Sequence, residues 1–381
     1  MKLHSRNWLS ISSLLPIFAS AIHLHVNADI VIAQVAPMTN PIVAEGKEIN
    51  LGIRIAIDAA NARQDIPGQK IILRTEDDQL DPEKTVALIR KLAKSDTLAL
   101  LNVIGSPTMA KILQERVLEA EKIPLIGVIP GSEALRKPMN PYVFHVRASD
   151  SEQYRRLIRN ALTIGLNRIA VVYLDTPPVK AGVQTVDHLL KEASLTTVAQ
   201  IAIPINGDKL HAEAIKSLKT ANPNLILLAL PGQIAGEVVN AYRSQGMHAQ
   251  ITSLSYGNAE AICQGASAEA ARGVSIAQIL PSIRNTAIPL VRQFNEDFQR
   301  FSAQNSKPNN MQFEGYVSAR VLIEGIKRIN GAPSREKLIR ALNSMQNINL
   351  GGFPIDYSPS KHHGSEYVEI GVLTNGCTML Y

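Results

Sequence analysis

The chain has 381 residues, of which 45% are apolar and 19% are charged, enough material for about two packed domains. The formal net charge is +6, and because lysine and arginine are spread along the chain rather than gathered in a stripe or patch, we expect no nucleic-acid partner. Aromatic residues make up only 4%, so alanine, isoleucine, leucine and valine must fill the interior. That composition favours buried parallel strands under helices over an aromatic-rich β-sandwich.

Residues 1–28 have the three parts of a secretory signal peptide. Lys2 and Arg6 form the positive end, the mostly apolar run 8–22 follows, and Ala28 is the small residue before the expected cleavage point. The alternative is a membrane anchor, but the apolar run is shorter than the ~20 residues that a spanning helix needs. We therefore expect a periplasmic mature protein that begins near Asp29 and does not insert into the membrane after cleavage.

After this leader, apolar runs alternate with amphipathic segments in two series. The first series predicts strands at 30–36, 70–75, 98–104, 124–128 and 142–146, and helices at 46–63, 82–94 and 106–122. The second predicts strands at 168–174, 198–204, 225–230, 250–255 and 274–280, and helices at 149–165, 181–193, 208–220 and 234–245. Residues 286–347 are mostly helical, with breaks near 306–310 and 330–333, and strand signals return at 353–357 and 367–373.

Continuous apolar strands separated by amphipathic helices are typical of βαβ units and parallel sheets. The strands are too many for one comfortable sheet, so the sequence predicts an α/β protein with two doubly wound, Rossmann-like lobes joined by crossover hinge strands. The late helices suggest that the chain crosses back between the lobes. We expect an N-terminal lobe of 29–146 plus about 279–349, and a C-terminal lobe of 147–278 plus about 350–381.

Only two cysteines occur, Cys263 and Cys377, and their separation fits no metal site. In an oxidising compartment they could form a disulfide, or each could be a small buried residue, and the sequence leaves both possibilities open.

Ligands of open α/β sheets bind beyond the carboxyl ends of the strands. The third predicted strand is followed by Gly105, and we expect Ser106 to cap the next helix and Pro107 to be its first residue. Free N–H groups and the helix dipole there would suit a carboxylate or another acceptor oxygen. The alternative is an ordinary capped helix with no ligand. Gly131 and Ser132 follow the next strand and favour the binding site.

Other polar groups point less clearly to chemistry. Asp77 and Asp78 could be paired carboxylates, but we favour a solvated turn before the helix that Asp81 caps. His362 and His363 could ligate a metal, but we expect exposed loop residues. No motif of a hydrolase, metalloprotease, phosphate-binding loop or dinucleotide site occurs. We therefore expect no catalytic residue, no metal and no cofactor.

Several segments, in their order along the chain, resemble the type I periplasmic binding proteins, in particular the branched-chain amino-acid (Leu/Ile/Val) receptors of ABC transporters. The segments are IVIAQVAP at 30–37, EDD and DP within 76–82, IPLIG at 123–127, GSEALR at 131–136, NPYVFHVRAS at 140–149, RIAVVY at 168–173, EGY and ARVL within 314–322, and LGGF at 350–353. The resemblance covers nearly all of the mature chain.

This resemblance implies a type I periplasmic binding protein fold, a ligand between two lobes, and hinge closure that presents the closed form to a membrane ABC permease. Family members hold the carboxylate of an amino acid with the turn after the third strand and the loop after the fourth. The matching positions here are Gly105, Ser106, Thr108, Pro130, Gly131 and Ser132.

The second lobe departs from the family pattern. Asp175 ends the lobe's first strand as in relatives, but Pro178 stands where a Tyr-Gly pair is expected, and Gly232 replaces a second aromatic. The acid that pairs with the ligand's ammonium falls near Tyr256 and Asn258, where no carboxylate stands. Burying an unpaired ammonium would be costly, so we expect these four second-lobe positions (178, 232, 256 and 258) to contact a neutral or anionic ligand instead.

The sequence thus predicts a periplasmic solute-binding receptor that captures a small polar ligand, such as an amino acid, a carboxylate or an amide, and delivers it to an ABC permease. A sensory ligand-binding module for a signalling partner is the alternative. An enzyme such as an amidase or a hydrolase is the hypothesis that we favour least.

Overall fold

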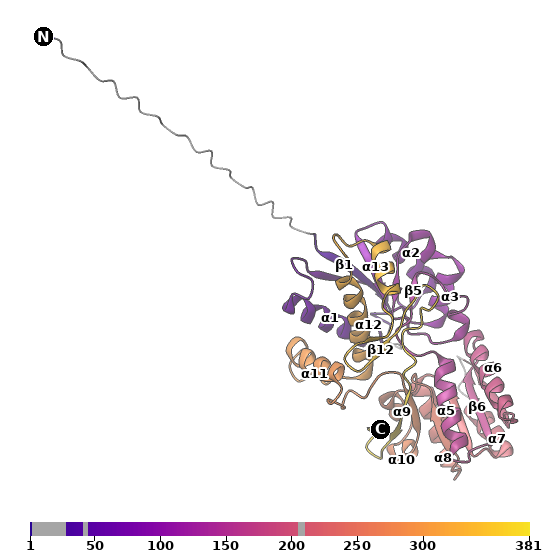
Figure 1. Cartoon of the computed structure of the whole chain (residues 1–381). Coiled ribbons are helices and arrows are strands. Elements are labelled where there is room, and N and C mark those ends of the chain that lie inside the picture. The colour runs from indigo at the N-terminus through magenta and orange to yellow at the C-terminus, as the bar shows by residue number, and fades with distance from the viewer. Residues whose placement is uncertain (2–27, 41–44, 205–209) are drawn as a thin grey trace.

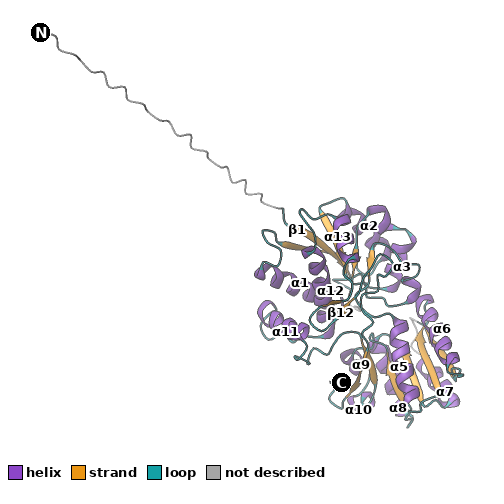
Figure 2. Ribbon diagram, in the orientation of Figure 1, coloured by secondary structure: helices purple, strands orange, loops and turns teal. Residues whose placement is uncertain are grey.

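The computed structural model describes Met1 and residues 28–40, 45–204 and 210–381. The chain forms two α/β lobes that lie one above the other in the view of Figure 1, and Figure 2 shows helices on both sides of each sheet. The predicted leader and the start of the helix expected at 208 fall at least partly outside the described residues. Within the described part, no helix is long and apolar enough to cross a membrane.

The first lobe contains a five-stranded parallel sheet in the order β2-β1-β3-β4-β5. Its strands are β1 (Ile30–Ala36), β2 (Ile71–Asp77), β3 (Thr97–Leu101), β4 (Leu125–Ile126) and β5 (Val143–Phe144). Its helices from the first part of the chain are α1 (Glu45–Arg63), α2 (Pro82–Ala93), α3 (Ser106–Gln114) and α4 (Val117–Glu121), with the short 3₁₀ helix η1 (Glu133–Leu135). The single helix predicted at 106–122 is divided, because Arg116 adopts the left-handed conformation with φ 50°.

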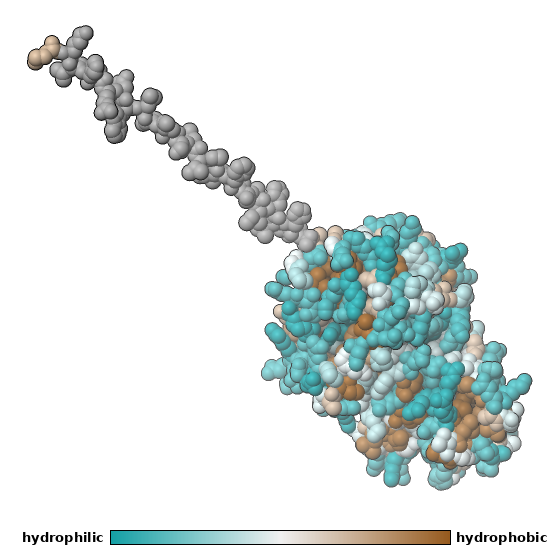
Figure 3. Space-filling view, in the orientation of Figure 1, coloured by the Kyte–Doolittle hydropathy of each residue, from teal (hydrophilic) through white to brown (hydrophobic). Residues whose placement is uncertain are grey.

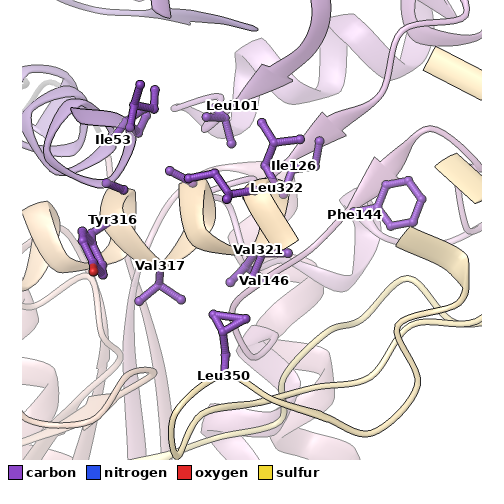
Figure 4. Close-up of a cluster of buried hydrophobic side chains, with 14 of the residues drawn as sticks. Ile53, Leu101, Ile126, Phe144, Val146, Tyr316, Val317, Val321, Leu322 and Leu350 are labelled. Atoms are coloured by element: carbon purple, nitrogen blue, oxygen red, sulfur yellow. The ribbon is translucent and has the colours of Figure 1, made fainter. Parts of the chain in front are cut away.

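Three late helices complete this lobe: α11 (Pro289–Phe301), α12 (Asn310–Lys327) and α13 (Arg335–Asn343). Helix α12 runs through the lobe's apolar core, which Figure 4 shows between α1 and the sheet. A Cβ atom on Gly52 of α1 would lie 1.7 Å from the carbonyl oxygen of Gln312, and one on Gly315 would lie 2.1 Å from that of Ile49. Only glycine at these two positions lets α1 and α12 pack this closely.

The second lobe contains a seven-stranded sheet in the order β14-β13-β10-β9-β8-β6-β7. Its parallel strands are β6 (Ile169–Leu174), β7 (Ala199–Ile203), β8 (Leu225–Ala229), β9 (Gln250–Ser253) and β10 (Ser275–Gln278), and the antiparallel ones are β13 (Glu369–Leu373) and β14 (Met379–Leu380). Its helices are α5 (Asp150–Thr163), α6 (Pro177–Glu192), α7 (Leu210–Ala221), α8 (Gly232–Ser244), α9 (Ala259–Gly265) and α10 (Ala268–Ala271). Helix α6 begins four residues earlier than predicted, because its two prolines fit the first helical turn.

The chain passes from the first lobe to the second after β5 and returns after β10 to form α11–α13. The strand expected at 353–357 is the short β12 (Pro354–Ile355), which pairs with β11 (Ile348–Asn349) in a separate two-stranded sheet. Phe353, Ile355 and Tyr357 pack in the core of the first lobe. We therefore propose that the last crossing comes after Tyr357 rather than near residue 350.

The two histidines of this last crossing differ from the expectation of an exposed loop. His362 is only 1% exposed, and its ring stacks on Phe144 with the ring centroids 4.1 Å apart. His363 stacks on His145 of the first crossing. Burial lowers the pKa of His362 and of His363, which favours their neutral forms. These residues fasten two crossing segments together, and the Lys361–Gly364 sequence pattern carries no signal for that tertiary contact.

Cys263 and Cys377 form a disulfide that joins α9 to the turn between β13 and β14. Of the two possibilities that the sequence left open, the structure has the disulfide.

The surface of the two lobes differs in hydropathy. In Figure 3 hydrophilic residues dominate the upper lobe, whereas the lower lobe, which contains the disulfide, has more apolar patches.

Replacing both cysteines by serine should destabilise the second lobe by about 2–4 kcal/mol, because the bond closes a loop between residues 114 apart in sequence. Urea unfolding of the oxidised wild type and the C263S/C377S double variant measures the difference. Equal midpoints and slopes would show that the bond does not constrain the chain.

Candidate ligand-binding site between the lobes

The start of α3 is the first-lobe segment at which we predict contact with a ligand. Gly105, with φ +92°, is the N-cap residue, and Ser106 is the first residue of the helix, so the prediction that Ser106 caps it was wrong by one position. The reason is that glycine adopts this positive φ without strain, which lets the chain turn one residue earlier. Thr108 is fully buried, and within the described residues its hydroxyl oxygen has no hydrogen-bond partner.

The loop after β4 meets the second lobe directly. The backbone N–H of Gly131 donates to the hydroxyl oxygen of Tyr256 at 2.6 Å. The hydroxyl of Ser132 donates to the carbonyl oxygen of Pro178, in the first turn of α6, at 2.9 Å. The structure therefore brings together predicted site residues that lie 125 and 46 positions apart in the sequence.

A carboxylate that the sequence reasoning missed lies at the same point. Asp150 is the first residue of α5, which Ser149 caps as predicted, and its Oδ1 accepts a hydrogen bond from the Tyr256 hydroxyl at 2.8 Å. Asp150 is partly exposed, and desolvation raises the pKa of its carboxyl group. No motif marks this residue, because only the folded crossing places it beside Gly131.

Arg147 connects the crossing to both lobes. Its guanidinium pairs with Glu314 of α12, in the first lobe, at 3.2 Å. It also donates to the hydroxyl of Ser255 and lies over the ring of Tyr256, 4.9 Å from the centroid, in the second lobe. Both members of the ion pair are buried, and burial raises the pKa of Glu314 although Arg147 opposes the rise. The pair thus depends on its geometry to offset a large desolvation cost.

A second guanidinium lies beside this pair. Arg136, 2% exposed, donates to the carbonyl oxygen of Arg147 from two nitrogens, each at 3.3 Å. Asp150 and Glu133 attract the guanidinium of Arg136 electrostatically, but neither forms an ion pair with it among the described residues. Two cations, Arg136 and Arg147, therefore lie together with the carboxylates of Glu314 and Asp150 where the lobes meet.

The two other second-lobe positions have structural roles. The side chain of Asn258 is the N-cap of α9 and accepts from the N–H of Ala261 at 2.8 Å. A Cβ atom on Gly232 would lie 2.5 Å from the Cβ of Ala261, so the close packing of α8 on α9 requires glycine there. Their contact with a ligand, like that of the other predicted positions, stays a prediction.

The acidic pair at the end of β2, Asp77 and Asp78, is not the solvated turn that we favoured. Asp78 is fully buried and accepts from the N–H of Leu80 and the hydroxyl of Thr85. Asp77 accepts from Met38 and Thr39, and although desolvation opposes the change, these hydrogen bonds lower its pKa to about 2. Asp77 thus holds the segment after β1, and Asp78 holds the turn that leads into α2. Across the described part of the chain, no group of His, Cys, Asp and Glu could hold a metal ion.

A hollow of about 770 Å³ lies elsewhere, on the second lobe. Its lining includes Ile164, Leu218, Tyr242, Met247 and Gln250, all from one lobe. The hollow lies within one lobe and includes none of the predicted site residues, so we do not take it as the candidate site.

Two α/β lobes of this topology, with polar loops that meet between them, are typical of two-lobed solute-binding proteins. The chain belongs to the periplasmic binding proteins, whose family model, described as "Periplasmic binding protein", matches residues 29–377. It is 22% identical over 373 residues to Leu/Ile/Val-binding protein homolog 7 of Brucella melitensis, covering 93% of this chain and 90% of that one. The resemblance and the two-lobed fold are thereby confirmed.

Solved structures show the same two-lobed fold. A substrate-binding periplasmic protein from Ralstonia solanacearum superposes with a TM-score of 0.83 and 30% identity over 91% of this chain and 98% of that one. A branched-chain amino-acid ABC transporter protein from Thermus thermophilus with bound valine gives 0.81 and 18% identity over 92% and 94%. The chain is therefore a periplasmic binding protein that is similar to Leu/Ile/Val-binding proteins, and this family is not enzymatic.

Replacing Glu314 by alanine should destabilise the protein by about 3–5 kcal/mol, because it leaves the charge of Arg147 buried and unpaired. The double variant R147M/E314L, which removes both charges, should recover most of that loss. Denaturant unfolding of the three proteins tests this, and a loss below about 1 kcal/mol for Glu314→Ala would show that the pair is solvated rather than buried.

Proposed function

We propose that the protein is exported to the periplasm, captures a small polar solute in the cleft between its lobes, and delivers it to an ABC permease. The observation that carries the proposal is the pair of groups at the Tyr256 hydroxyl. The N–H of Gly131 is a donor 2.6 Å away, and the carboxylate of Asp150 is an acceptor 2.8 Å away. The lobes therefore present complementary polar groups to the same point.

These groups suit a solute that carries an acceptor oxygen next to a donor. A carboxylate or amide oxygen would accept from Gly131, and the exposed N-terminus of α3 would favour negative charge on it. An amide or ammonium nitrogen would donate to Asp150. The class comprises amino acids, carboxylates and amides.

Asp150 is a possible substitute for the acidic residue that the second lobe lacks near 256–258. The family resemblance led us to expect an acid near 256–258 to pair with an ammonium, and the sequence has no carboxylate there. The structure contains a carboxylate from α5 next to Tyr256. Its raised pKa and its own hydrogen bond with the tyrosine make it a weaker partner for a cation than a free carboxylate, so a neutral donor such as an amide remains the better match.

The periplasmic location is supported by two independent features. The first 28 residues have the signal-peptide pattern, and the disulfide between Cys263 and Cys377 is stable in an oxidising compartment. A measurement of the N-terminal residue of the exported protein tests the expected start at Asp29.

Three solutes on one carbon skeleton separate the possible donors. We expect 3-methylbutanamide to bind more tightly than 3-methylbutanoate, which lacks a donor, and more tightly than valine, whose ammonium would face a tyrosine-bonded carboxylate. Titration calorimetry at pH 7 gives the three dissociation constants. Tightest binding by valine would reverse our inference about the donor while leaving the cleft as the site.

Replacing Ser106 by leucine should abolish binding of the tightest of the three solutes and leave the melting temperature nearly unchanged, because the side chain would cover the N-terminus of α3 at the rim. Ser106→Ala is the matched control and should bind like the wild type, since it leaves the N–H groups accessible. Unchanged affinity in Ser106→Leu would remove α3 from the site.

A further inference from the structure

We infer that Tyr256 is an internal ligand: in the absence of solute its hydroxyl occupies the polar groups of the cleft and holds the lobes closed. A solute must displace it. The effect on solute affinity rests on the function proposed above, but the closure itself is a property of the protein alone and is measured without any solute.

The inference starts from the two hydrogen bonds of one hydroxyl group. The Tyr256 oxygen accepts from Gly131 of the first lobe and donates to Asp150 of α5. It therefore gives a partner to the buried N–H of Gly131, which would be costly to leave unsatisfied, and it also binds the partly exposed carboxylate of Asp150. Burial raises the pKa of Tyr256 above its ordinary value, so the phenol keeps the proton that it donates.

The space at this point is filled by the chain's own atoms. A Cβ atom on Gly131 would lie 2.2 Å from Oδ1 of Asp150 and 2.8 Å from the hydroxyl oxygen of Tyr256. Beside it, Ser132 bonds to Pro178 across the same boundary. A solute atom cannot reach the N–H of Gly131 until the tyrosine withdraws.

Arg147 keeps the tyrosine in place. The guanidinium lies over the aromatic ring, and it bonds to the neighbouring Ser255 while its partner Glu314 belongs to the first lobe. The ring is thus fixed on one side by a cation and at its tip by two hydrogen bonds. This arrangement ties the second lobe to the first through protein groups alone.

A solute and the Tyr256 hydroxyl therefore compete for the same two groups, the N–H of Gly131 and the carboxylate of Asp150. Only the open fraction of molecules accepts a solute, so the apparent dissociation constant exceeds the intrinsic one by the inverse of that fraction. A solute replaces the tyrosine without loss only if it accepts from the N–H of Gly131 and also donates to Asp150, because a partner left unsatisfied is costly. Tyr256 would therefore exclude solutes that lack either the acceptor or the donor.

The test compares Tyr256→Phe with the wild type, both free of solute. The variant loses both hydrogen bonds, so the open form should gain population, and hydrogen exchange at the amide of Gly131 should accelerate by roughly tenfold. Small-angle X-ray scattering should give a larger radius of gyration for the variant, whereas the wild-type profile should match the closed structure described here.

Tyr242→Phe is the matched control, because it removes a hydroxyl from α8 of the same lobe, at the hollow away from the cleft. It should leave both measurements unchanged. Gly131→Ala is a second variant that acts by a different route, since its added methyl would collide with Asp150. It should open the lobes as Tyr256→Phe does.

Three results would overturn the inference. One is a solute-free wild type whose scattering fits only separated lobes. A second is a Tyr256→Phe protein with wild-type scattering and wild-type exchange at Gly131. Faster exchange in β8 as well as at Gly131 would also count against it, because that pattern indicates a loosened second lobe rather than an opened cleft. None of these outcomes depends on whether a solute has been found.

Discussion

The contact on which the site depends most is the buried ion pair between Arg147 and Glu314. Arg147 lies where the chain first leaves one lobe for the other, and the pair anchors this crossing to α12, the helix that runs through the first core. Ion pairs of this kind gain little net stability, because desolvation offsets most of the attraction. This ion pair instead fixes where the crossing lies. The residues that follow Arg147, including Asp150, therefore begin the second lobe beside the loop at Gly131.

The rest of the architecture explains why loops of the two lobes meet there. Both sheets are built mainly from parallel strands, so their carboxyl ends each gather on one edge, and loops from those edges provide Gly105, Gly131 and Tyr256. Three crossings connect the lobes, and the first and last of them are fastened by the stacked rings of His145 and His363. Rigid lobes with a short shared hinge suit closure as a rigid-body movement.

Much of this could be predicted from the sequence, and the rest could not for physical reasons. Apolar periodicity located most strands and helices, because burial repeats locally along the chain. The loop at 130–132, which contacts the second lobe, was predicted from a strand end, whereas a ligand contact at 105–108 stays a prediction. Asp150 and the burial of His362 were missed, because each depends on contacts between segments far apart in the sequence. The cap of α3 was misplaced because the positive φ of Gly105 leaves no pattern in the residues around it.

The most direct measurement of the central claim is the melting temperature of the exported protein across a library of amino acids, aliphatic and aromatic carboxylates, amides and short peptides. A solute that binds only the folded state raises the melting temperature by mass action. The account predicts a saturable rise with one class of small polar solute. A flat response from a well-folded protein across the whole library would contradict it.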